Sequence, residues 1–204
     1  MERIVGEGMP GKCPAGARQC LAVPGIIEQM PAPTRFPRSH IVALTLLFAA
    51  CTPALNWRDV RPEDSGLLMQ FPCRPDQQTR TLPLAGAPVQ LSLLACAASK
   101  LTWGLAHTDV GDAARVETAL AALAAAAAAN LGATPAVAQS QAIAGASSPG
   151  RRLKLQGRLP DGAAVQMQLI LFTRGTHVFQ ATVLGEQVPD EAAQTYFESL
   201  RLAP

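Results

Sequence analysis

The side chains best suited to acid–base or metal chemistry in this chain are its histidines, and His107 and His177 lie well inside the sequence. Asp109 and Asp112 follow His107 closely, so a histidine and a carboxylate could together bind a metal ion. A zinc site needs three or four converging ligands, however, and the chain has neither an H-x-x-x-H nor a C-x-x-C spacing. We therefore expect no metal site. An enzyme with a dispersed site that uses His107 or His177 stays open as an alternative.

Motifs for nucleophilic or phosphate chemistry are also missing from the sequence. There is no G-x-S-x-G elbow, and Ser65, Ser92 and Ser199 have no neighbouring residues that would activate them. The glycines are too dispersed to form a phosphate-binding loop between a strand and a helix. We therefore expect neither an enzymatic activity nor a cofactor.

The residues before Cys51 have the layout of a secretory signal. Arg35 and Arg38 give a positive start without acidic residues, and residues 41–50 form an apolar run. Small residues directly precede Cys51, and Phe48 lies three residues upstream, where leucine is usual. This arrangement resembles the lipobox of bacterial lipoproteins, whose cysteine is acylated through its sulfur and becomes the new N-terminus. The resemblance implies that Cys51 carries a lipid that anchors the protein in a membrane.

Two other interpretations of the apolar run stay open at this stage. As a transmembrane anchor, residues 41–55 are about 15 residues long and include Pro53, whereas a membrane-spanning helix needs about 20. Apolar runs of about 10–14 residues are also common in buried core helices. The flanking arginines, the cysteine that follows and the change of composition after Pro53 favour the signal.

The signal interpretation divides the chain into four parts. Residues 1–29 mix glycine, proline and cysteine without periodicity, and Met30 would begin a signal of ordinary size over residues 30–50. We expect synthesis to begin at Met30 and residues 1–29 to be a mis-called, disordered extension. Residues 51–56 would then be a lipid-anchored tether, and residues 57–204 a single domain.

The net charge of the whole chain, +2, comes from its first 50 residues. These residues hold five of the 17 lysines and arginines and three of the 15 acidic residues, which leaves 12 of each sign downstream. Arg151, Arg152 and Lys154 form the densest basic group, within an alternating segment. A nucleic-acid partner needs a clustered positive face, so we expect none.

Only two cysteines, Cys73 and Cys96, follow Cys51. In an exported protein a pair of cysteines favours a disulfide, because exported compartments are oxidising. The alternative is two buried thiols that pack as small apolar side chains. We expect the disulfide, and this expectation rests only on the oxidising compartment that an exported protein would reach.

Hydrophobic periodicity predicts an α+β fold, a mostly antiparallel β-sheet with a long central helix and a C-terminal helix packed on it. Asp112 is the expected N-cap of the central helix, and Pro189 is expected to start the second. Polar residues from Arg152 to Arg158 alternate with leucines, which predicts one buried and one solvent-exposed face. The strands are expected at residues 67–71, 79–84, 89–97, 101–107, 153–159, 165–172 and 177–184. A short strand is also expected near residues 137–143, and the central helix is expected at 112–131.

This order of elements and several short stretches resemble the PsbP-like and DcrB-like α/β sandwich domains. The resemblance covers most of residues 57–202, and several proteins of this kind are small bacterial lipoproteins. It implies an α/β sandwich and brings no catalytic motif. The matching stretches are Trp57…Gly66-Leu67…Phe71-Pro72 and Gly175…Val178-Phe179-Gln180-Ala181…Phe197…Ser199-Leu200-Arg201.

Together these observations predict a non-enzymatic, lipid-anchored protein of the cell envelope that acts as a binding or assembly module. By resemblance to Gram-negative lipoproteins, Thr52 after the cysteine, rather than an aspartate, favours the outer membrane, facing the periplasm. A second alternative is a periplasmic carrier of a small apolar ligand, held in a cavity beneath the central helix. The expected partners are the membrane, through the lipid on Cys51, and another envelope protein.

Overall fold

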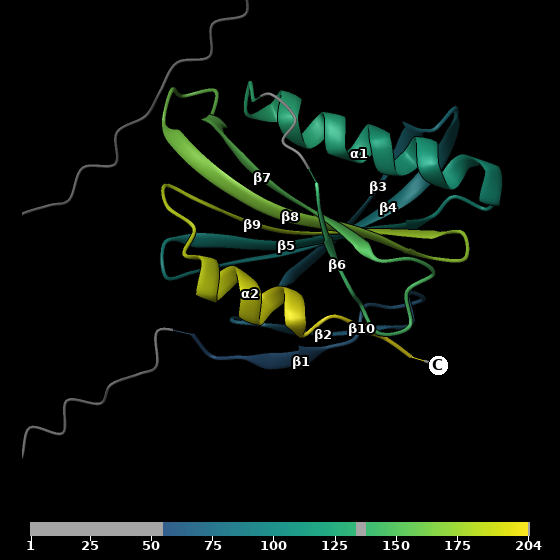
Figure 1. Cartoon of the computed structure of the whole chain (residues 1–204), viewed down its shortest axis with the longest axis horizontal. Helices are drawn as coiled ribbons and strands as arrows, with labels where there is room; N and C mark the ends of the chain where they lie inside the picture. The colour runs from purple at the N-terminus through teal and green to yellow at the C-terminus, as the bar shows by residue number, and fades with distance from the viewer. Residues whose placement is uncertain (1–54, 134–137, 204) are drawn as a thin grey trace, which may run out of the picture. The chain divides into compact units, whose positions relative to one another are not determined.

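The structure is a computed structural model that describes residues 55–133 and 138–203 (Figure 1). The expected signal, the expected start at Met30 and Cys51, the cysteine expected to carry a lipid, lie outside these residues. None of the helices in the described ranges has the length and apolar character that crossing a membrane would require.

The described residues form two antiparallel β-sheets. The main sheet has seven strands in the order β3-β4-β5-β9-β8-β7-β6, and the small sheet has the order β1-β2-β10. The strands are β1 (Arg58–Val60), β2 (Leu67–Phe71), β3 (Asp76–Leu84), β4 (Ala87–Ala98), β5 (Leu101–Asp109), β6 (Gln139–Gln141), β7 (Gly150–Arg158), β8 (Ala164–Arg174), β9 (His177–Gly185) and β10 (Arg201–Leu202).

Two α-helices accompany the sheets, and the sequence explains where each begins. Asp112 accepts a hydrogen bond from the backbone N–H of Ala114 at 2.9 Å and caps the 3₁₀ turn η1 (Ala113–Arg115), which leads into α1 (Val116–Asn130). The second helix, α2 (Asp190–Glu198), follows Pro189, and its acidic first turn complements the helix dipole. The predicted α+β class with a mostly antiparallel sheet is confirmed.

The main sheet is covered on both faces, α1 on one side and α2 with the small sheet on the other (Figure 1). Strand β8 shows the consequence, because every residue from Met167 to Thr173 is buried. Leu169 and Leu171 belong to the apolar cluster beneath α1, whereas Ile170 and Phe172 belong to the cluster beneath α2. A strand buried on both faces loses the simple alternation of polar and apolar residues.

The C-terminal end of α1 lies directly on β7. A Cβ atom at Gly157 would be 2.1 Å from the carbonyl oxygen of Leu131, and the backbone N–H of Arg158 donates to that oxygen at 2.9 Å. Only glycine permits this approach, and the alanine-rich sequence of α1 keeps the rest of the helix close to the sheet. The cluster beneath α1 is filled by buried side chains such as Leu120, Leu153 and Leu169.

Aromatic side chains pack the opposite core. Trp103 and Tyr196 are fully buried with ring centroids 5.2 Å apart, and Phe71 lies 5.4 Å from Tyr196. The Tyr196 hydroxyl donates to the backbone carbonyl of Gly104 at 3.0 Å, and burial raises the pKa of that hydroxyl well above its ordinary value. These aromatic residues are therefore core residues.

Candidate functional site

Cys73 and Cys96 form a disulfide in the structure, with their Cα atoms 6.0 Å apart. Cys73 follows β2, and Cys96 lies in β4 beside Ala95, the partner of Asp76 at the start of β3. Both cysteines pack at the edge of the aromatic core. The bridge thus holds the chain at the point where it enters the main sheet.

The structure brings the two candidate histidines to one face of the main sheet. His107 in β5 pairs with Phe179 in β9, and Asp109 pairs with His177. Both imidazole rings stack on Phe179, with centroid distances of 6.0 Å for His107 and 6.3 Å for His177. Asp109 lies near His177, 3.5 Å from its Nε2, whereas Asp112 is occupied as the cap of η1.

The surroundings of these histidines are those of a packed core edge. His107 is buried, and neither its Nε2 nor the Nδ1 of His177 has a hydrogen-bond partner among the described residues. Burial lowers the pKa of His107, and proximity to His177 adds to the effect, while Asp64 opposes it. Within residues 55–133 and 138–203, no group of three or more potential metal ligands converges. A neutral buried imidazole on Phe179 acts chiefly as a packing element.

The lowered pKa of His107 leads to a testable prediction about how the stability of the fold depends on pH. Because the unfolded chain binds a proton at this residue more readily, we expect the free energy of unfolding to fall as pH drops below 6.5, the ordinary histidine value. His107→Phe keeps a ring against Phe179 and should flatten this decline between about pH 7 and pH 5. Urea titrations of both proteins across this range measure the effect, and parallel pH curves would contradict the assignment.

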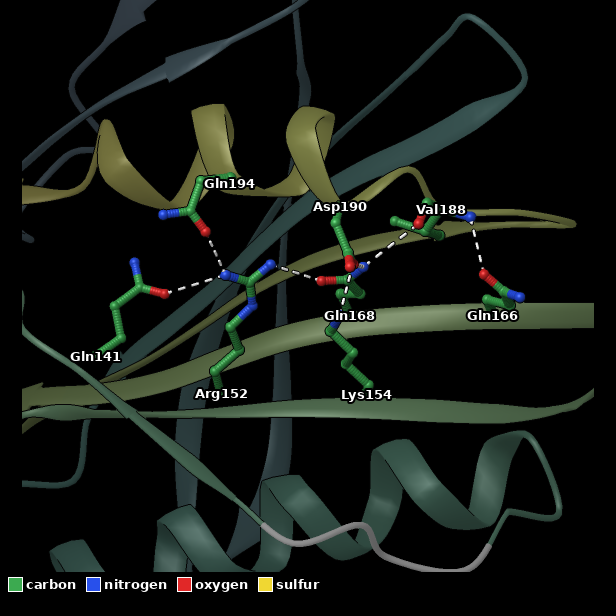
Figure 2. Close-up of polar contacts among 8 residues, drawn as sticks. All are labelled: Gln141, Arg152, Lys154, Gln166, Gln168, Val188, Asp190 and Gln194. Carbon is green, nitrogen blue, oxygen red and sulfur yellow. Dashed lines mark hydrogen bonds and ion pairs between the residues drawn. The ribbon is translucent and has the colours of Figure 1, made fainter.

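A second polar site, which the sequence analysis missed, lies between the main sheet and α2 (Figure 2). Its centre is Arg152 in β7. Arg152 is only 9% exposed, although the alternation of polar residues and leucines along β7 predicts that its side chain faces solvent. That prediction was wrong for Arg152, because α2 covers this part of the face. The ring of Phe197 lies 5.0 Å from the Arg152 guanidinium carbon.

The partners of Arg152 are amide oxygens. Its guanidinium donates to the side-chain oxygens of Gln168 and Gln194, each at 2.7 Å, and to that of Gln141 at 3.5 Å. These glutamines come from β8, α2 and β6, so one cation joins four elements. The Nε of Arg152 is buried and has no hydrogen-bond partner in the part of the chain that the structure describes.

The hydrogen bonds continue from Arg152 to a charged pair at the first turn of α2 (Figure 2). Gln168 donates to Asp190 at 2.7 Å, and Lys154 forms an ion pair with the same carboxylate oxygen at 2.6 Å. The bond from Lys154, followed by the bond from Gln168, lowers the pKa of Asp190. Asp190 therefore stays ionised at neutral pH and orients two side chains on the sheet.

Beside this network is an open pocket of about 330 Å³, large enough for a small polar molecule. Its walls present an ammonium group, a carboxylate and amides, from Lys154, Gln156, Gln166, Gln168 and Asp190. The sequence signal for this site is the glutamines at alternate positions in β8. What these glutamines face depends on Val188, just before α2, and on Asp190 in its first turn, which contact them only in the folded chain.

A third feature bears on the carrier alternative. Buried apolar side chains cluster beneath α1, where the carrier alternative expects an apolar cavity, and that cavity stays a prediction. An apolar pocket of about 430 Å³ lies on the small sheet, where Leu67, Leu68 and Leu202 are flanked by Arg61 and Arg201.

Comparison with known proteins adds little to these observations. No protein-family model matches the chain, and no curated protein matches it. One solved structure that does match is PA94 from Pseudomonas aeruginosa, a protein of unknown function. The match covers 73% of this chain and 99% of that chain at 14% sequence identity, with a TM-score of 0.42. At this identity and TM-score the similarity does not indicate a function for the chain, so the function is inferred from the chain's own residues.

Proposed function

We propose that this chain is a non-enzymatic, lipid-anchored protein of the cell envelope whose domain serves binding or assembly. The observation that carries the proposal is the disulfide between Cys73 and Cys96. Disulfides persist in oxidising compartments and are rare in the cytosol, so the bridge agrees with export. The apolar run that ends at Cys51 supplies the export signal and the site of lipid attachment.

The environment of the histidines supports the non-enzymatic part of this proposal. A general acid or base must reach a substrate, whereas the His107 ring is buried against Phe179. The pockets on the small sheet and beside α2 are lined by other residues. The polar pocket at Lys154 and Asp190 offers groups suited to binding.

The anchor is tested by Cys51→Ser, which removes the sulfur that would carry the lipid. We expect the protein to move from the membrane fraction to the soluble fraction and to lose incorporation of labelled fatty acid. Cys20→Ser is the matched control, because Cys20 lies upstream of the proposed start at Met30. An unchanged membrane fraction for Cys51→Ser would contradict the proposal.

The outer-membrane assignment and the start site are tested with the same cells. Density-gradient separation of the two envelope membranes should place the protein with the native Cys51 in the outer membrane, as Thr52 after Cys51 favours.

A gene that begins at Met30 should yield a mature protein of the same mass as the longer gene. Peptides from residues 1–29 in a digest of the expressing cells would contradict that start.

A further inference from the structure

Within residues 55–133 and 138–203, strand β3 forms one edge of the main sheet, and one side of its backbone has no pairing strand. Its other side pairs with β4 along all nine residues. Residues 76–81 are exposed on both faces of the sheet, so none of the described elements covers this part of the strand. An edge of this kind presents free N–H and C=O groups that can pair with another strand.

Both ends of β3 are held in place. The disulfide fixes the chain just before Asp76, and Arg115 donates to the backbone carbonyl of Leu84 at 2.7 Å at the other end. Arg115 also donates to the carbonyls of Ala85 and Val110, which holds the β3–β4 turn on the start of α1. A strand held at both ends loses little conformational freedom when it binds a partner.

The sequence of the exposed segment, Asp76-Gln77-Gln78-Thr79-Arg80, is complementary to itself in antiparallel pairing. When two copies meet around a two-fold axis at Gln78, Asp76 of each copy lies opposite Arg80 of the other. These residues occupy the same sheet face, because they alternate along β3. Opposite charges directly across a strand pair are stabilising, and this register places two such pairs at one junction.

These charges have no ion-pair partner in the described part of their own chain. Arg80 donates to the side chain of Gln78 at 3.1 Å, and no salt bridge involves Asp76 or Arg80 there. Pro75, which has no N–H, would lie opposite Thr81 of the second copy and end the ladder on each side. The complementary segment is therefore limited to the five residues that carry the charges.

We propose that β3 is the surface through which two copies of this chain pair, in the register centred on Gln78, to form one continuous sheet. A ladder of five residues is much smaller than a standard interface of about 1,600 Å², so the affinity in dilute solution is low. Two copies anchored in one membrane meet at effective concentrations of about a millimolar, which favours even weak pairing. This last step rests on the proposed lipid anchor, whereas the pairing itself does not.

The register is tested by exchanging charges in full-length protein that carries Cys51→Ser, so that the result does not depend on lipid attachment. The parent should show a monomer–dimer equilibrium in sedimentation experiments up to about a millimolar. Asp76→Arg places like charges opposite each other, as does Arg80→Asp. Each should weaken self-association about tenfold or more. An equimolar mixture of the two variants restores both opposite-charge pairs and should form a heterodimer about as stable as the parent dimer.

Matched controls make the same charge changes elsewhere. Glu63→Arg and Arg61→Asp alter exposed residues near the β1–β2 turn and should leave self-association unchanged. All four positions are exposed, so circular dichroism spectra and melting temperatures should match the parent. A monomeric parent at every concentration, or a mixture of the two β3 variants that stays monomeric, would overturn the proposal. Neither result would affect the anchor, which the membrane fractionation tests separately.

Discussion

Arg152→Ala should lower the free energy of unfolding by about 2–4 kcal/mol. The substitution removes the donor for Gln168 and Gln194 and leaves the Gln168 oxygen buried without a partner. It also removes the cation from the ring of Phe197 and opens space beneath α2. Urea unfolding followed by circular dichroism measures the loss.

The neighbouring residue is a control for this prediction. Arg151 points to the opposite face of β7 and forms an exposed ion pair with Glu117, at side-chain exposures of 48% and 69%. Arg151→Ala should therefore change the free energy of unfolding by less than about 1 kcal/mol. Equal losses for the two alanine variants would show that the polar network beneath α2 does not stabilise the fold.

Arg152→Lys adds a second comparison. Lysine keeps the positive charge but lacks the planar fork that reaches Gln141, Gln168 and Gln194 together. We expect its stability to lie between that of the native protein and that of Arg152→Ala. A fully stable lysine variant would mean that charge alone, rather than the geometry of the guanidinium, holds α2 on the sheet.

Loss of the disulfide should lower the free energy of unfolding by about 3 kcal/mol. Cys73 and Cys96 are 23 residues apart, and the bridge restricts the unfolded chain over that loop. For a domain of this size the loss corresponds to a melting temperature about 6–12 °C lower. The measurement is thermal unfolding of a variant with serine at both positions.

Reduction of the native protein provides the control for the disulfide. Reductant should lower the melting temperature of the native protein to that of the double serine variant, and it should leave the variant unchanged. Alkylation followed by mass measurement reports the number of free thiols in protein isolated from cells. Two free thiols at Cys73 and Cys96 would contradict the argument from an oxidising compartment.

Much of the secondary structure could be predicted because the relevant signals are local. Asp112 caps its helical turn through a hydrogen bond to a residue two positions away. The turn between β7 and β8 follows from Pro160, Asp161 and Gly162, and the Asp161 side chain accepts from the N–H of Ala163 at 3.0 Å. Such signals act within a few residues and need no knowledge of the rest of the fold.

The elements that were missed depend on distant partners. Strands β1 and β10 were not predicted, since each is short and exists only because it pairs with β2. Strand β3 begins at Asp76 rather than Thr79, because its polar start has no apolar alternation and is held by β4. Pairing energy overrides local sequence preference at these positions.

The sequence by itself determined the α+β class and the choice of Cys73 and Cys96 as the pair, whereas the export signal that ends at Cys51 stays a prediction. These follow from composition, periodicity and the small number of cysteines. Only the tertiary structure decided that Arg152 is buried and that β3 is the open edge of the main sheet. The physical reason is that burial depends on which element covers a face, and strand order depends on which strands pair. Neither is encoded in the spacing of neighbouring residues.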